Sequence, residues 1–297
     1  MARVVARLRP VWSRAMVALL LLLVVEVAVV LLDAPVEGIL TRADWGPPAL
    51  AVALVVLWVL VGVAPRSHVD DPVTLAPPVR GEWVAVNSPG QKLPSHGTRT
   101  RGQYSAVDVC GRAAAGGPPL VRWGLRGTAP ARYPGYDEPV LAMAAGEVVR
   151  VLDRQRDHRA RDTWQALILM VALEGLLREL GGTRKVLGNH VVVAHDDGTA
   201  AVYAHLRRGS AAVRTGQRVA DGEPLGRVGN TGNTSLPHLH VQLMDHVHVD
   251  AAAGIPLAWS DVEPTGEIDE RFASYAKPPA DSALPTMPRN GEVFVAG

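Results

Sequence analysis

The chain is poor in cysteine, in phenylalanine and in net charge. Its single cysteine, Cys110, excludes an intramolecular disulfide. The formal charge at pH 7 is +1, so no global charge favours a polyanion such as nucleic acid as a partner. With only two phenylalanines, the predicted strands consist of valine, alanine and leucine, which suits thin, closely packed sheets. A length of 297 residues allows one domain of ordinary size with appendages.

Residues 1–65 contain two apolar runs. The first is apolar except for Glu26, and the second is wholly apolar. With its flanks, each run is about long enough to cross a hydrocarbon layer of ~30 Å. We therefore predict a membrane region with two transmembrane helices, at about 15–33 and 47–64. Glu26 is costly within a bilayer and is expected to face the partner helix, another subunit or water. A cleaved signal peptide is the alternative for the first run.

The pattern of the remaining residues predicts a β domain with one insertion. After a proline-containing linker over residues 66–81, short alternating strands separated by glycine and proline predict a domain over residues 82–262. Residues 154–182 interrupt it, because arginines there precede apolar residues at helical spacing from 163 to 180. This inserted helix either packs on the sheet, or is a lid or a membrane-contacting helix beside a groove. Residues 263–297 are rich in proline, and we expect a tail that is extended along the domain or partly disordered.

Two histidines two residues apart, His238 and His240, follow a glycine-rich turn and begin an apolar strand. Side chains at i and i+2 of a strand point to the same face, so both imidazoles aim at one point while Leu239 faces the opposite layer. Two neutral imidazoles that converge are what a zinc or similar divalent ion requires. Such a pair is a weak signal alone, so its meaning depends on whether the chain supplies further ligands.

Upstream segments supply these candidates. One contains His96 and, after eleven intervening residues, Asp108; another ends on Tyr-Ala-His-Leu and contains His205. With a Pro-Val-x-Ala segment between them and a Gly-Asn-Thr-Gly-Asn turn before Pro-His-Leu-His, these segments resemble, in order, the LytM/lysostaphin-type zinc metalloendopeptidases. That family has the duplicated hybrid motif fold and cuts the peptide part of bacterial cell walls. The resemblance covers roughly residues 82–245.

The resemblance implies a zinc ion (Zn2+) with three ligands, His96, Asp108 and His240, and two catalytic histidines, His205 and His238. The common family pattern has the first histidine and the aspartate four residues apart, so the longer spacing here departs from it. Three protein ligands leave one coordination position open for water, as in catalytic zinc sites. The metal activates that water, and a histidine with a pKa near neutrality can accept its proton or stabilise the oxyanion.

Other conspicuous residues have no predicted part in this site. Four further histidines are expected at strand ends or in surface loops: His190, His195, His246 and His248. Cys110 is expected to pack as a small apolar side chain. The glycines of the turn precede a strand rather than a helix, so no helix N-terminus is available for phosphate and we reject a nucleotide site.

The sequence therefore predicts an all-β catalytic domain with an antiparallel, LytM-like sheet and one inserted helix, preceded by two transmembrane helices. The predicted activity is that of a membrane-anchored zinc metalloendopeptidase that hydrolyses peptidoglycan stem or cross-bridge peptides. The lipid bilayer is the second expected partner, and neither nucleic acid nor nucleotide is expected. Two alternatives stay open: a non-catalytic LytM-like module that binds wall peptide or regulates another hydrolase, and a zinc peptidase of protein substrates.

The predicted location contains a conflict. Four arginines before the first apolar run favour a cytoplasmic N-terminus by the positive-inside rule: Arg3, Arg7, Arg9 and Arg14. Two crossings would then return the domain to the cytoplasm, whereas wall peptide lies outside. We expect the protein at the cell membrane with its catalytic domain outside the cytoplasm, through a first run that fails to cross or an inverted hairpin.

Overall fold

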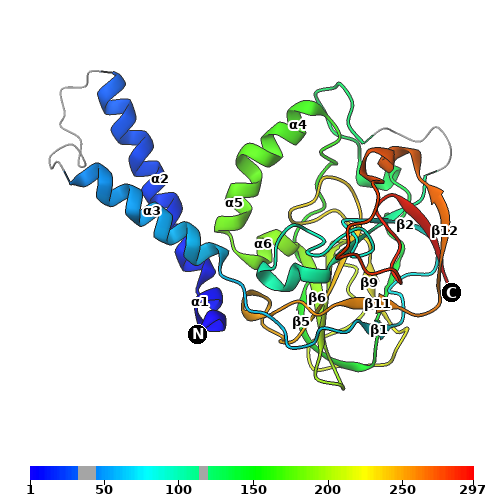
Figure 1. Ribbon diagram of the computed structural model, residues 1–297. Helices are drawn as coiled ribbons and strands as arrows, with labels where there is room; N and C mark the ends of the chain where they lie inside the picture. The colour runs from blue at the N-terminus through cyan, green and yellow to red at the C-terminus, as the bar shows by residue number, and fades with distance from the viewer. Residues whose placement is uncertain (33–44, 114–119) are drawn as a thin grey trace.

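The structure, a computed structural model, describes residues 1–32, 45–113 and 120–297. Its N-terminal helices are α1 (Ala2–Arg7), α2 (Arg9–Leu31) and α3 (Gly46–Gly62), and the pair α2 and α3 projects from the domain (Figure 1). Among the described residues, α2 alone is both long and apolar enough to cross a membrane. Helix α3 has 17 residues, which is about 25 Å at a rise of 1.5 Å per residue. The N-terminal region is therefore one apolar helix of spanning length and a shorter apolar helix.

Glu26 is buried between these two helices. Its exposed fraction is 6%, and it lines a cavity together with Leu23 and Val27 of α2 and with Leu50 and Leu54 of α3. Of the settings expected for this carboxyl group, the structure has the one that faces the neighbouring helix.

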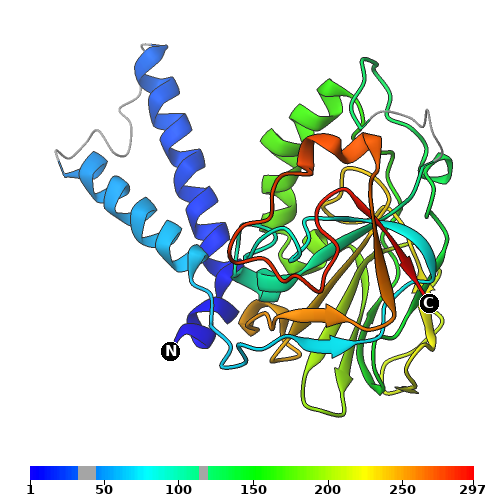
Figure 2. The same ribbon diagram turned by 45° about the vertical axis from the view of Figure 1, so that its right-hand side comes forward.

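The two ends of the helical pair lie together against the domain. Nε and Nη2 of Arg9 donate to the carbonyl oxygens of Val61 and Val63 at 2.9 and 2.6 Å. Nη1 of Arg3 lies 3.0 Å from Oδ1 of Asp245 in the domain. The N-terminus, the end of α3 and the domain thus share one end of the pair, while its other end points away (Figures 1 and 2).

The domain is built on a nine-stranded sheet whose strands are all paired antiparallel in the order β12-β13-β2-β3-β10-β7-β6-β5-β8. Its strands, in chain order, are β2 (Gly81–Val86), β3 (Val107–Gly111), β5 (Gly146–Leu152), β6 (Asn189–His195), β7 (Ala200–Leu206), β8 (Arg218–Val219), β10 (Leu239–Met244), β12 (Val262–Ile268) and β13 (Glu292–Ala296). Two small sheets complete it, β1 (Val73–Leu75) with β11 (Leu257–Trp259) and β4 (Pro139–Leu141) with β9 (Pro224–Arg227). Valine and leucine side chains fill the core, as the composition suggests.

The C-terminal segment, expected as a tail that is extended along the domain or partly disordered, contributes two strands to this sheet. β13 pairs with β2, with Phe294 opposite Trp83. Val293 and Phe294 are fully buried, and the free energy gained by burying them outweighs the disorder favoured by the surrounding prolines. Residues 73–75 of the predicted linker likewise form β1.

The insertion is helical, as predicted. It consists of α4 (Trp164–Leu169), a π-helical turn η3 (Met170–Glu174) and α5 (Gly175–Leu180), followed by α6 (Thr183–Leu187). Oγ1 of Thr163 caps α4 by accepting from the backbone N–H of Ala166 at 3.4 Å. No residue from α4 to α5 is buried. The helix therefore does not pack on the sheet but stands beside it, on the side of the α2–α3 pair (Figure 2).

Candidate metal centre

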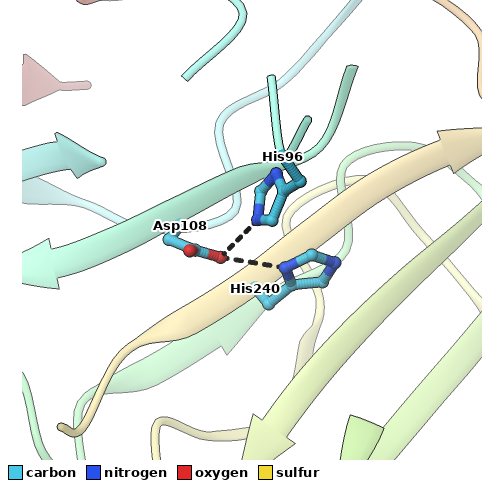
Figure 3. Close-up of side chains that lie close together, drawn as sticks. All are labelled: His96, Asp108 and His240. Carbon is cyan, nitrogen blue, oxygen red and sulfur yellow. Dashed lines mark hydrogen bonds and ion pairs between the residues drawn. The ribbon is translucent and has the colours of Figure 1, made fainter. Parts of the chain in front are cut away.

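Asp108 and His240 meet through strand pairing. They lie directly opposite each other on β3 and β10, and paired residues of antiparallel strands present their side chains on the same face. Nδ1 of His240 lies 2.8 Å from Oδ1 of Asp108. Figure 3 shows this contact together with the one made by His96.

His96 reaches the same carboxylate from the loop after β2. Its Nε2 lies 3.2 Å from Oδ1 of Asp108. The eleven residues between His96 and Asp108 form a loop whose two ends are held together by Ser95. Its backbone N–H donates to the carbonyl oxygen of Tyr104 at 3.0 Å, and its Oγ donates to that of Ala106 at 2.5 Å. The long spacing therefore still brings the histidine back beside the aspartate.

His205 joins the site through a β-bulge. On β6 the register advances by one residue, from Asn189 to His190, while on β7 it advances by two, from Leu206 to Ala204. His205 is the extra residue and has a φ of 64°, in the left-handed region that non-glycine residues seldom adopt. Ala204 pairs with His240, so regular alternation would turn His205 to the opposite face. The bulge instead leaves its ring 5.7 Å from that of His240.

Backbone carbonyls fix the tautomers of the two remaining histidines. Nδ1 of His205 lies 2.8 Å from the carbonyl oxygen of Thr231, and Nδ1 of His238 lies 2.8 Å from that of Leu236. A carbonyl oxygen can only accept, so each Nδ1 carries the proton and Nε2 is left for the site. Nε2 of His238 lies 3.6 Å from Oδ1 of Asp108, and the rings of His205 and His238 are 4.8 Å apart.

The glycine-rich turn holds the carbonyl that orients His205. Gly232 has a φ of +79°, and a Cβ atom there would lie 2.4 Å from the backbone nitrogen of Gly188. Only glycine permits this approach. It places Thr231 where its carbonyl accepts from His205 and its Oγ1 accepts from the backbone N–H of Asn189 at 2.9 Å. The glycine-rich turn is thus explained by its structural role, which is to position the Thr231 carbonyl that orients His205.

Two supporting residues were not found by sequence reasoning. Nδ2 of Asn87 donates to Oδ2 of Asp108 at 2.8 Å. Oε1 of Gln242 lies 3.0 Å from Nε2 of His240. No motif marks Asn87, which follows β2. Gln242 continues the i, i+2 series of His238 and His240, so the alternation that identified those residues could also have identified it.

The protonation states follow from burial and charge. Burial alone would raise the pKa of the Asp108 carboxyl, but the charges of His96 and His238 and the hydrogen bonds from His240 and His96 hold it well below its usual range. Burial, together with the charges of His238 and His240, holds the pKa of His205 well below its ordinary value. Burial also lowers the pKa of His238, against the opposing charge of Asp108. Asp108 is therefore ionised, and both of these histidines are neutral.

The donor set fits a divalent metal ion. His96, Asp108 and His240 each offer one ligand atom, and these atoms lie within 4.8 Å of one another. Two imidazole nitrogens and one carboxylate oxygen are ligands that zinc accepts, at bond lengths of about 2.0–2.2 Å. The carboxylate and the His240 ring are buried, so a bound cation would compensate a charge that is otherwise shielded from water.

The candidate metal site opens into a cavity of about 380 Å³, which all five predicted site residues line. The inserted helix forms one wall through Met170, Gly175 and Glu179. A smaller cavity of about 160 Å³ continues past Asp108 and His238 to Leu167 of α4 and to Tyr275, in the short helix η5 (Glu270–Tyr275) of the C-terminal segment. Together they form an elongated groove across the site.

The other conspicuous residues lie elsewhere. His190 and His195 are near the two ends of β6, and His246 and His248 stack on each other in the turn after β10. Cys110 is buried in a cluster of apolar side chains. Burial and the neighbouring Asp108 charge raise the pKa of its thiol, so Cys110 is not an activated nucleophile.

Comparison with known proteins agrees with this geometry. Residues 168–251 match the model of Peptidase family M23. Over these residues the chain is similar to peptidase family M23. The matched M23 segment contains His205, His238 and His240, and strand pairing and the closed loop add Asp108 and His96 to it.

Two curated relatives match over part of their length. A peptidoglycan DD-endopeptidase of Vibrio cholerae, ShyC, is 36% identical over 92 residues, which are 30% of this chain and 20% of that protein. The cell division protein DipM of Caulobacter vibrioides is 37% identical over 79 residues, 27% of this chain and 13% of that protein. The matches thus span a fifth or less of these relatives.

Solved structures with similarity to the chain include the catalytic domain of lysostaphin from Staphylococcus simulans. It is 20% identical with a TM-score of 0.27, covering 50% of this chain and 73% of that one. A putative M23 peptidase from Pseudomonas aeruginosa is 19% identical with a TM-score of 0.30, covering 64% of this chain and 51% of that one.

Proposed function

We propose that this protein is a membrane-anchored zinc endopeptidase that hydrolyses peptide bonds in the stem or cross-bridge peptides of peptidoglycan. The observation that carries the proposal is the meeting of His96, Asp108 and His240 around one carboxylate oxygen, with the neutral His205 and His238 beside them. The substrate class rests on the activity of the relative ShyC, a peptidoglycan DD-endopeptidase.

The chemistry divides between the metal and the two neutral histidines. When bound to His96, Asp108 and His240, zinc supplies an activated water nucleophile and polarises the scissile carbonyl. Nε2 of His205 accepts the proton of the attacking water and passes it to the amine nitrogen as the C–N bond breaks. Nε2 of His238 accepts a hydrogen bond from the same water and orients it. Because both Nδ1 atoms are held by carbonyls, neither ring has to turn during this transfer.

The groove suits an extended peptide. The two cavities share Asn87, Asp108 and His238, so a substrate chain can pass the metal site with residues bound on either side. The inserted helix bounds both cavities, through Met170 in one and Leu167 in the other. Specificity for the bond cleaved would therefore depend on α4 to α5 and on the C-terminal segment.

The proposed location is the outer side of the cytoplasmic membrane, with α2 as the anchor. Because the N-terminus and the domain share one end of the helical pair, a pair that crosses twice leaves both on the same side. Arg3 is paired with Asp245, and Arg9 lies 3.8 Å from Asp250. Two of the arginines that favour a cytoplasmic N-terminus thus have acidic partners in the domain.

The test is digestion of purified peptidoglycan by the full chain in detergent, with and without zinc, and with Asp108→Ala as the matched control. We expect zinc-dependent peptide products, identified by mass, which the control does not release. Full zinc occupancy without peptide cleavage would identify a non-catalytic wall-binding module instead. Cleavage of protein substrates alone would replace the substrate class.

A further inference from the structure

Exposed apolar side chains are concentrated at one place in the domain. After α3, the described residues include twelve large apolar side chains that are exposed. Nine of them lie on the inserted helix or on the loop beside its start: Trp123, Leu125, Trp164, Ile168, Leu169, Val171, Leu173, Leu176 and Leu177. A contiguous apolar surface of this kind marks an interaction site rather than ordinary solvent contact.

The inserted helix distributes its polar and apolar side chains in the opposite way to a surface helix of a soluble domain. Its charged side chains are turned inward, where Glu174 accepts from Arg161 at 2.7 Å and Glu179 pairs with Arg101 at 2.5 Å. Its apolar side chains are turned outward, with Ile168 64% and Val171 72% exposed. A soluble helix buries its apolar stripe and exposes its charges. The observed arrangement instead fits an apolar medium outside the helix.

The loop before the insertion extends this surface at the start of α4. The backbone N–H of Arg122 donates to Asp162 at 2.8 Å, and that of Trp164 donates to Arg122 at 3.3 Å. These bonds hold the loop with Trp123, which is 80% exposed, beside the start of the helix. Tryptophan favours the boundary between hydrocarbon and headgroups, so two tryptophans at this end suit a position in that boundary.

The neighbouring anchor identifies what covers the surface. The inserted helix stands on the same side of the domain as α2 and α3 (Figures 1 and 2). Its end contacts α2, where Nε of Arg14 lies 3.5 Å from the carbonyl oxygen of Leu180. Helix α2 is the one described helix with the length and composition to cross a bilayer. The apolar surface is thus continuous with a segment suited to lipid.

We propose that residues 123–125 and the helix from Trp164 to Leu180 form a lipid-inserted arm, a second contact with the bilayer beside the anchor. The same helix lines the groove on its inner side through Met170, Gly175 and Glu179. The arm therefore holds the groove at a fixed height at the membrane surface, where it meets substrate close to the bilayer. The lipid contact goes beyond the proposed hydrolysis and does not depend on it.

The ion pairs make the arm rigid with respect to the site. Arg101 is buried, pairs with Glu179 and donates from Nε to Oγ1 of Thr183 at 3.2 Å. Its carbonyl oxygen accepts from Nε2 of Gln242 at 2.6 Å, and Gln242 contacts His240. A chain of polar contacts thus links the lipid-facing helix to a candidate metal ligand.

The arm is tested by depth-dependent fluorescence quenching of the full chain in vesicles of phosphatidylcholine and phosphatidylglycerol. A bimane label is placed at Val171→Cys in a Cys110→Ala background. The matched control is Asp197→Cys in the turn between β6 and β7, at the end of β6 away from the insertion. Both positions are exposed, so both variants should fold.

We expect quenchers attached to lipid chains to reduce the fluorescence of the label at 171 several-fold more than that of the label at 197. Aqueous iodide should instead quench the label at 197 more than the label at 171. This result does not require zinc or activity, so it stands or falls separately from the proposed hydrolysis. Equal quenching by iodide at both positions would overturn the proposal. Protection of position 171 in detergent, with a doubled molecular mass, would also overturn it by showing that a second copy covers the helix.

Discussion

Oε1 of Gln242 lies 3.0 Å from Nε2 of His240, on the side of the ring away from Asp108. The amide oxygen can only accept, so it holds a ring proton on Nε2, and Nδ1, which faces Asp108, is the nitrogen that a metal would bind after displacing its proton. The amide is itself fixed, because its Nε2 donates to the carbonyl oxygen of Arg101 at 2.6 Å. One side chain thus sets both the tautomer and the angle of a ligand.

Removing this acceptor is expected to weaken metal binding. Gln242→Met keeps the length of the side chain but accepts no strong hydrogen bond, so the His240 ring is free to turn and to change tautomer. We expect zinc affinity to fall by about 10- to 100-fold, the usual cost of losing such a partner. Competition with a chromophoric chelator measures it. Gln242→Glu, which retains an oxygen acceptor, should lose less; equal losses in the two variants would count against the hydrogen-bond account.

Stability below neutral pH is expected to depend on His190. This ring is buried, and burial lowers its pKa from 6.5 to about 4. As pH falls below 6.5, the imidazole of His190 becomes protonated in the unfolded chain but stays neutral in the folded protein. The free energy of unfolding therefore decreases until about pH 4. Between pH 7 and pH 5 the loss from this group is roughly 2 kcal/mol.

His190→Gln removes the titrating group and is the control for this effect. Denaturant unfolding of both proteins at pH 7 and pH 5 gives the difference. The variant should lose less stability over this interval than the parent chain. An identical pH dependence in the two proteins would show that the His190 ring is not held neutral.

The location of the domain can be measured at the first residues after α3. Ser67→Cys in a Cys110→Ala background places a single thiol between the helical pair and β1. We expect a membrane-impermeant thiol reagent to label it in intact cells with a permeable wall. Labelling only after lysis would place the domain in the cytoplasm, where wall peptide is absent, and would favour a zinc peptidase with another substrate.

Much of the architecture could be predicted because it depends on local patterns. The alternation that puts His238 and His240 on one face is a property of the strand itself. The helix after Thr163 follows from its spacing and its cap. The direction of His205 could not be predicted, since it depends on a bulge that appears only when β6 and β7 pair. Similarly, the strand at 292–296 depends on an edge offered by β2.

The most direct test of the account is to separate metal binding from turnover with His205→Ala. In the proposed mechanism His205 accepts and passes on a proton and does not bind the metal. The full-length variant should therefore retain zinc at the level of the parent chain while losing about 10²- to 10⁴-fold in the rate of peptide release from peptidoglycan. Zinc content by elemental analysis and product release by mass spectrometry are measured on the same preparations. Undiminished peptide release by zinc-loaded His205→Ala would contradict the account.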